Sequence, residues 1–146
     1  MEPRLDYKAA SPDAFKAMLA LEAAVHKLGI EPSLIELIKL RASQLNGCAF
    51  CVDMHASDAL KAGETQRRLN AVAVWREAPF FTARERAALA WTESLTLLAQ
   101  THAPDEDYEQ LRAQFSETEM VNIGLAICTI NAWNRLAVGF RSMPPA

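Results

Sequence analysis

Two cysteines and a histidine recur at helical spacing near the middle of the chain, as Cys48-x-x-Cys51-x-x-x-His55. On an α-helix these three side chains share one face within two turns, because residues three and four apart are neighbours there. Two sulfurs this close can form and reopen a disulfide, provided that one of them ionises to the reactive thiolate. The spacing therefore favours dithiol redox chemistry.

The start of a helix alone does not activate such a thiol. Gly47 precedes Cys48 and places the pair at a helix N-terminus, where free N–H groups and the helix dipole favour a thiolate. An ordinary thiol is only about 3% ionised at pH 7, and lowering its pKa by two units takes about 2.7 kcal/mol. The dipole supplies about 0.3–1 kcal/mol, so a base or cation is needed as well. His55, one turn after Cys51, can supply it.

Two other interpretations of the cluster stay open on the residues alone. Zinc would need Cys48, Cys51 and His55 with Glu36 as a fourth ligand, but three ligands on one helix face close a tetrahedron poorly. No second Cys/His pair is present to complete such a site. Alternatively, both cysteines are small buried hydrophobic residues, as free cysteines often are.

Composition narrows the class of protein. The 146 residues are 51% apolar and carry a net charge of -3, so no basic field attracts nucleic acid. The N-terminus lacks the basic and apolar regions of a secretory signal. The most apolar stretch, 120–140, contains three asparagines and Arg135 and is too polar for a membrane span. We expect a cytoplasmic protein, where a close cysteine pair is more often catalytic or metal-binding than structural.

Helix signals cover almost the whole chain, with no run of alternating apolar residues. Thr82-x-x-Glu85 and Ser116-x-x-Glu119 match the capping box that starts a helix. The predicted helices are 12–28, 32–46, 48–63, 65–76, 83–100, 105–115 and 117–138. We therefore predict one all-α domain, 1–146, folded as a compact bundle of about six to seven helices.

The last predicted helix carries apolar residues on nearly every side and must be covered all round. Either its own chain wraps it as a central core helix or a neighbouring subunit covers it, and we predict a homo-oligomer. Cys128 lies on this helix, and we expect its side chain in the protein core. Arg41 lies among leucines and isoleucines, so we expect it to pair with Glu93 or Asp53. His26 and His102 have no companions in the sequence, and we assign them no chemistry.

Residues 39–55, Lys-Leu-Arg-Ala-Ser-Gln-Leu-Asn-Gly-Cys-Ala-Phe-Cys-Val-Asp-Met-His, closely resemble the core motif of the alkylhydroperoxidase D / carboxymuconolactone decarboxylase family. The core motif spans 36–64. More loosely, the similarity continues through 84–91 and 130–135.

This resemblance implies an all-α fold assembled into trimers or hexamers, and a peroxidase activity without metal or organic cofactor. In the peroxidase branch the second cysteine, here Cys51, is oxidised by a hydroperoxide. Cys48 then donates a proton and closes the disulfide, while Glu36 and His55 form a proton relay. A dithiol reductant, either a thioredoxin-like or a lipoyl protein, would restore the thiols.

Some residues leave other functions open. Glu36 shares a helix face with Lys39 and Ser43, and that face could simply be solvated. Phe50 stands where the best-known peroxidases of the family have a second histidine, which questions the relay or the substrate. The alternatives are a decarboxylase-like lyase, although true decarboxylases of the family generally lack the cysteine pair, and a non-enzymatic redox-sensing oligomer. Asn131, Trp133 and Asn134 are expected at a pocket or a subunit contact.

Overall fold

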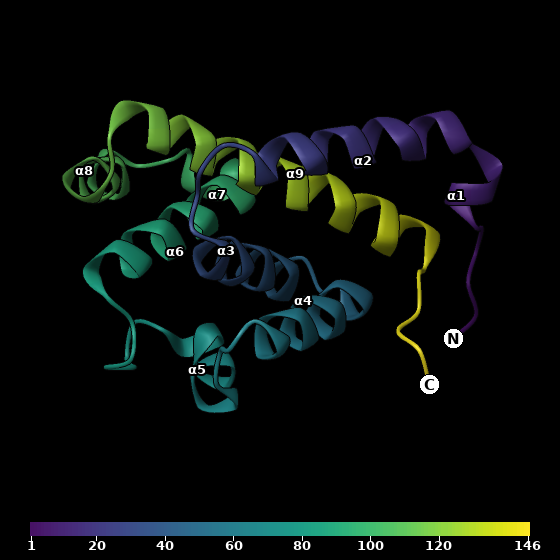
Figure 1. The fold of residues 1–146 in the computed structure, drawn as a ribbon, viewed down its shortest axis with the longest axis horizontal. Helices are drawn as coiled ribbons and strands as arrows, with labels where there is room; N and C mark the ends of the chain where they lie inside the picture. Colours follow the sequence, from purple (N-terminus) through teal and green to yellow (C-terminus); the bar gives the residue numbers. More distant parts are fainter.

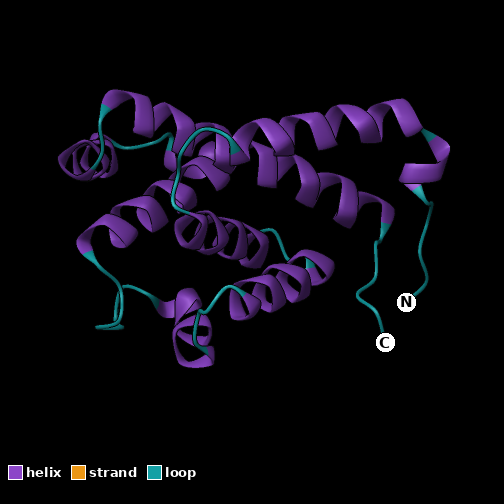
Figure 2. Cartoon of the chain, viewed as in Figure 1, coloured by secondary structure: helices purple, strands orange, loops and turns teal.

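The chain folds entirely as helices, so the all-α prediction is confirmed (Figures 1 and 2). The computed structural model describes residues 1–146. Its elements are α1 (Tyr7–Ala10), α2 (Pro12–His26), α3 (Pro32–Leu45), α4 (Ala49–Lys61), α5 (Gln66–Ala71), a 3₁₀ turn (Val72–Val74), α6 (Ala83–Thr96), α7 (Leu98–Thr101), α8 (Asp105–Gln114) and α9 (Glu117–Phe140).

Helix α3 is the central element of the fold. It packs against α4, α6 and α9, and Figure 1 shows it lying among these helices. Pro32 starts it, at a position where the missing N–H is not needed for the helix. Its apolar side chains are buried on several sides: Leu34, Ile35, Leu37, Ile38 and Leu40. Burial of each such side chain contributes about 1.5–3 kcal/mol, so α3 holds the surrounding helices together.

Most predicted helices are confirmed, including both capping boxes, Thr82 with Glu85 and Ser116 with Glu119. The helix predicted over 65–76 is shorter and ends as a 3₁₀ turn. The helix predicted over 83–100 is divided at Leu97 into α6 and α7, and α1 is an additional short helix. The predicted count of six to seven therefore missed only short helices.

Helix α9 is not covered all round by its own chain. One side packs inward through Ile123, Ile127 and Ile130, whereas Val121 and Leu125 are exposed on the other. Cys128 is exposed too, so its expected place in the core is wrong. By length and composition α9 is apolar enough to cross a membrane, but its buried side accounts for much of that apolar character.

Glu93 on α6 ties three segments together. It accepts hydrogen bonds from Arg41 Nε at 2.8 Å and Trp75 Nε1 at 2.8 Å, and it also pairs with Arg76. Of the two partners predicted for Arg41, Glu93 and Asp53, Arg41 therefore pairs with Glu93. Burial alone would raise the pKa of Glu93, but the donors Arg76, Trp75 and Arg41 outweigh burial and hold the pKa below its ordinary value of 4.5.

Replacement of Glu93 by alanine is expected to lower the free energy of unfolding by about 3 kcal/mol, because it leaves the largely buried Arg41 without its acidic partner. The measurement is urea unfolding near neutral pH. Glu109→Ala is the control, since Glu109 pairs with Arg112 at the exposed surface and should cost less than about 0.5 kcal/mol. Equal losses in the two variants would contradict the role given to Glu93.

Candidate active site

Cys48 and Cys51 form a disulfide at the start of α4, with their Cα atoms 5.3 Å apart. Cys48 is the N-cap residue, and the backbone N–H of Cys51 donates to its Sγ at 3.3 Å. A helix N-terminus stabilises negative charge on the group that its free N–H groups contact. This end of the helix would therefore stabilise the negative charge that develops on Cys48 Sγ when the disulfide is broken.

A bracket of amide hydrogen bonds fixes where α4 begins. Asn46, directly after α3, donates from Nδ2 to Asn131 Oδ1 at 2.9 Å and to Asn134 Oδ1 at 3.0 Å. Asn134 in turn donates to Ser43 Oγ at 3.0 Å. Gly47 completes the turn into α4 with a φ of 65°, a backbone conformation that suits glycine. The two asparagines of α9 thus support the disulfide loop from within the chain.

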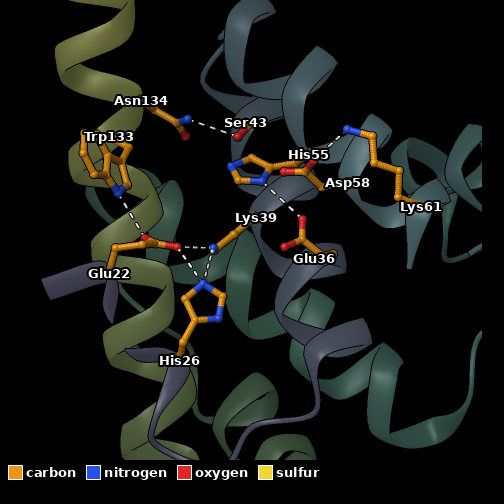
Figure 3. Close-up of polar contacts among 10 residues, drawn as sticks. All are labelled: Glu22, His26, Glu36, Lys39, Ser43, His55, Asp58, Lys61, Trp133 and Asn134. Carbon is orange, nitrogen blue, oxygen red and sulfur yellow. Dashed lines mark hydrogen bonds and ion pairs between the residues drawn. The ribbon is translucent and has the colours of Figure 1, made fainter. Parts of the chain in front are cut away.

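Glu36 on α3 and His55 on α4 contact each other, with His55 Nδ1 3.2 Å from Glu36 Oε2 (Figure 3). Their side chains are only 17% and 8% exposed, so the pair is largely shielded from water. A carboxylate can only accept, so Nδ1 of His55 donates the hydrogen bond. A neutral His55 then carries its lone pair on Nε2, which is free to take up a proton.

A cavity of about 410 Å³ is lined by these two residues and by one cysteine of the pair. Cys51, Glu36 and His55 line it, whereas Cys48 does not. Its apolar walls come from Phe15, Leu19, Phe50, Met54 and Trp133. Both cysteines are 2% exposed, so the cavity is the approach to Cys51 from outside. The four residues singled out from the sequence therefore lie together, with the two sulfurs in different surroundings.

The same cavity has a second polar cluster that the sequence did not reveal. Lys39 pairs with Glu22 of α2, and His26 lies 3.0 Å from Glu22 and 3.3 Å from Lys39 Nζ. Trp133 Nε1 donates to the other oxygen of Glu22 at 3.0 Å, so Trp133 lies at a pocket. The face of α3 that carries Glu36, Lys39 and Ser43 is not solvated, because Lys39 and Ser43 are buried. The expectation that His26 has no companions is also wrong, because it contacts Glu22 and Lys39.

The profile of the carboxymuconolactone decarboxylase family matches residues 12–94, more than half of the chain. The chain belongs to this family. The match covers α2 through most of α6 and includes Glu36, both cysteines of the disulfide and His55.

Two relatives of this family member are similar over nearly the whole chain. The uncharacterized protein YdfG of Bacillus subtilis is 41% identical over 138 residues, which is 94% of each chain. The crystal structure of ATU0492 from Agrobacterium tumefaciens, a protein of unknown function named as a candidate antioxidant defence protein AhpD, is 52% identical. Its TM-score is 0.97 over 99% of each chain. A peroxidase-related protein from Ralstonia eutropha, 24% identical with a TM-score of 0.82 over 94% of this chain and 74% of its own, shares the fold.

Glu22 makes the stability of this family member depend on pH. Burial would raise its pKa, but Lys39, Trp133 and His26 outweigh burial and lower the pKa from 4.5. The folded protein therefore releases this proton at lower pH than the unfolded chain does. Its stabilising contribution is present above pH 4.5 and is lost as the pH falls through the folded-state pKa.

Glu22→Gln is expected to lower the free energy of unfolding by about 2 kcal/mol at neutral pH. The gap to the original protein should narrow as the pH falls below 4.5, because the original protein then loses the charge as well. Urea unfolding of both proteins across this pH range measures the gap. Glu93 and Glu119 titrate in both proteins and cancel in the difference. A gap independent of pH would contradict this account.

Proposed function

We propose that the protein is a thiol-dependent peroxidase that reduces hydroperoxides through a Cys48/Cys51 dithiol–disulfide cycle. One observation carries the proposal: of the two bonded cysteines, only Cys51 lines the cavity that Glu36 and His55 also line. A substrate in the cavity would meet Cys51 and the proton acceptor His55 together, while Cys48 is bonded to Cys51 and does not line the cavity. The family and the 52% identity to the candidate antioxidant protein support the same activity.

In the oxidative half of the cycle, the Cys51 thiolate attacks the terminal oxygen of the hydroperoxide. The S–O bond forms and the O–O bond breaks, which gives a sulfenic acid on Cys51 and releases an alcohol or water. The thiol of Cys48 then displaces water from the sulfenic acid and closes the disulfide. An ionised Glu36 by itself opposes a thiolate, so we assign it the role of accepting the thiol proton through His55.

In the reductive half, an external dithiol must break the disulfide. We propose that its thiolate attacks the sulfur of Cys51, because Cys51 lines the cavity and Cys48 does not, and that Cys48 leaves as a thiolate. The N–H of Cys51, 3.3 Å from Cys48 Sγ, then stabilises the leaving group. A thioredoxin-like or lipoyl protein is the proposed reductant. The cycle suits the cytoplasm, where such dithiols are kept reduced.

The reduced protein should consume cumene hydroperoxide with dithiothreitol as reductant, and Cys51→Ser should lower the rate at least about 10³-fold, because it removes the nucleophile. In a separate experiment without dithiothreitol, one addition of peroxide should leave Cys48→Ser with a sulfenic acid that dimedone traps, whereas the original protein should close the disulfide. The experiments use a Cys128→Ser background, since Cys128 is exposed and reacts independently.

The same variants separate the alternatives. Unchanged peroxide turnover in Cys51→Ser would refute the peroxidase mechanism. Slow thiol loss without turnover, accompanied by a change in assembly, would favour a redox-sensing oligomer instead. An activity on a lactone acid that survives loss of both cysteines would favour a decarboxylase-like lyase.

We also propose a homo-oligomer, either a trimer or a hexamer, that buries the exposed side of α9. Val121 is 71% exposed there, one turn from the exposed Leu125, and exposed apolar patches of this kind are common at subunit contacts. Val121→Glu combined with Leu125→Glu is expected to lower the particle mass in light scattering, because it places charges in the contact. A protein that is already monomeric before substitution would contradict the proposal.

A further inference from the structure

Lys39 places an ammonium group in the wall of the redox cavity. It follows Glu36 by one turn of α3 and is only 3% exposed. Figure 3 shows Lys39 between two groups, with Glu22 and His26 of α2 on one side and Glu36 with His55 on the other. Lys39, Glu22 and His26 line the same cavity as Cys51. The cavity therefore carries two separate acid–base clusters.

The contacts of Lys39 leave it able to bind a ligand. An ammonium group has three N–H donors, and Glu22 accepts one of them. His26 Nε2 lies 3.3 Å from Lys39 Nζ but donates its own N–H to Glu22, so it does not use a Lys39 donor. A further N–H of Lys39 is therefore available to an oxygen atom in the cavity. Folding stability does not explain why Lys39 is charged and buried, because a buried ion pair stabilises a protein little or no more than apolar side chains of the same volume.

The geometry of peroxide cleavage suggests a role for the Lys39 ammonium group. A thiolate attacks in line with the O–O bond, so the leaving oxygen lies on the far side of the transferred oxygen from Cys51. Cys51 and His55 are both on α4, one turn apart. The leaving oxygen is therefore directed away from α4 and towards the other cavity walls, which α1, α2, α3 and α9 supply; the lysine of these walls that is buried beside Glu36 is Lys39.

We propose that Lys39 is the general acid that protonates the leaving oxygen, and that His26 and Glu22 restore its proton from solvent. The inference rests on the proposed peroxidase function. The S–O bond forms as the O–O bond breaks, sulfur loses two electrons to the peroxide, and the alkoxide takes a proton from Lys39 Nζ to become an alcohol. An alkoxide is a much stronger base than an amine, so the transfer is favourable. The side chain of His26 is 48% exposed and connects the neutral Lys39 with bulk water.

The test compares two oxidants that differ in their leaving group. Cumene hydroperoxide releases an alkoxide, which needs a proton, whereas peracetic acid releases acetate, which does not. The variant Lys39→Met/Glu22→Gln removes the acid without leaving an unpaired buried charge. Lys39→Arg is the second variant, because arginine keeps the ion pair with Glu22 but does not release its proton. Lys61→Met, at an exposed lysine of α4, is the control.

In both Lys39 variants, the ratio of kcat/KM for cumene hydroperoxide to kcat/KM for peracetic acid should fall about 10²-fold, and it should stay constant in Lys61→Met. A structural role of Lys39 would lower both rates together and leave the ratio unchanged, and that result would overturn the inference. Failure of the proposed function looks different, since the original protein would then turn over neither oxidant. Either Lys39 variant alone decides the matter if the other does not fold, as thermal unfolding will reveal.

Discussion

The hydrogen bonds of Asn46 to α9 are the constraint on which the redox site depends. They fix the turn between α3 and α4, and these two helices carry Glu36, Lys39, Cys51 and His55. A shift of α4 by one residue would rotate its side chains by about 100° around the helix axis. The contact between His55 and Glu36 and the opening of Cys51 onto the cavity would then both be lost. The bracket therefore sets the register in which the chemistry can occur.

The disulfide is asymmetric because its two sulfurs face different parts of the protein. Cys48 caps α4 and receives an N–H from the helix backbone, while Cys51 lies one turn further and lines the cavity. Two thiols of the same chemical type thus differ in charge stabilisation and in access. In the proposed function, a difference of this kind would let one sulfur meet the substrate while the other acts as resolving and leaving group.

The sequence predicted the fold class and the central cluster because both depend on local spacing. The helical offsets of Cys48, Cys51 and His55 bring these residues together whatever surrounds them. The family resemblance, rather than periodicity, pointed to Glu36. The cluster of Lys39, Glu22 and His26 was missed because it joins α2 to α3 across 17 residues, and no pattern on one helix shows such a pair. Likewise, the apolar pattern of α9 did not distinguish a buried side from an exposed one.

Helix α2 forms a cavity wall that is loosely tied to the fold. Only Val25 of its 15 residues is buried, yet Phe15 and Leu19 line the cavity beside Cys51. Substitutions at positions outside the core usually change stability little. Evolution can therefore alter the size and polarity of the chamber through α2 while the disulfide, held by α3, α4 and α9, stays intact. In the proposed function, this wall would set which hydroperoxide the protein accepts without altering the cysteine chemistry behind it.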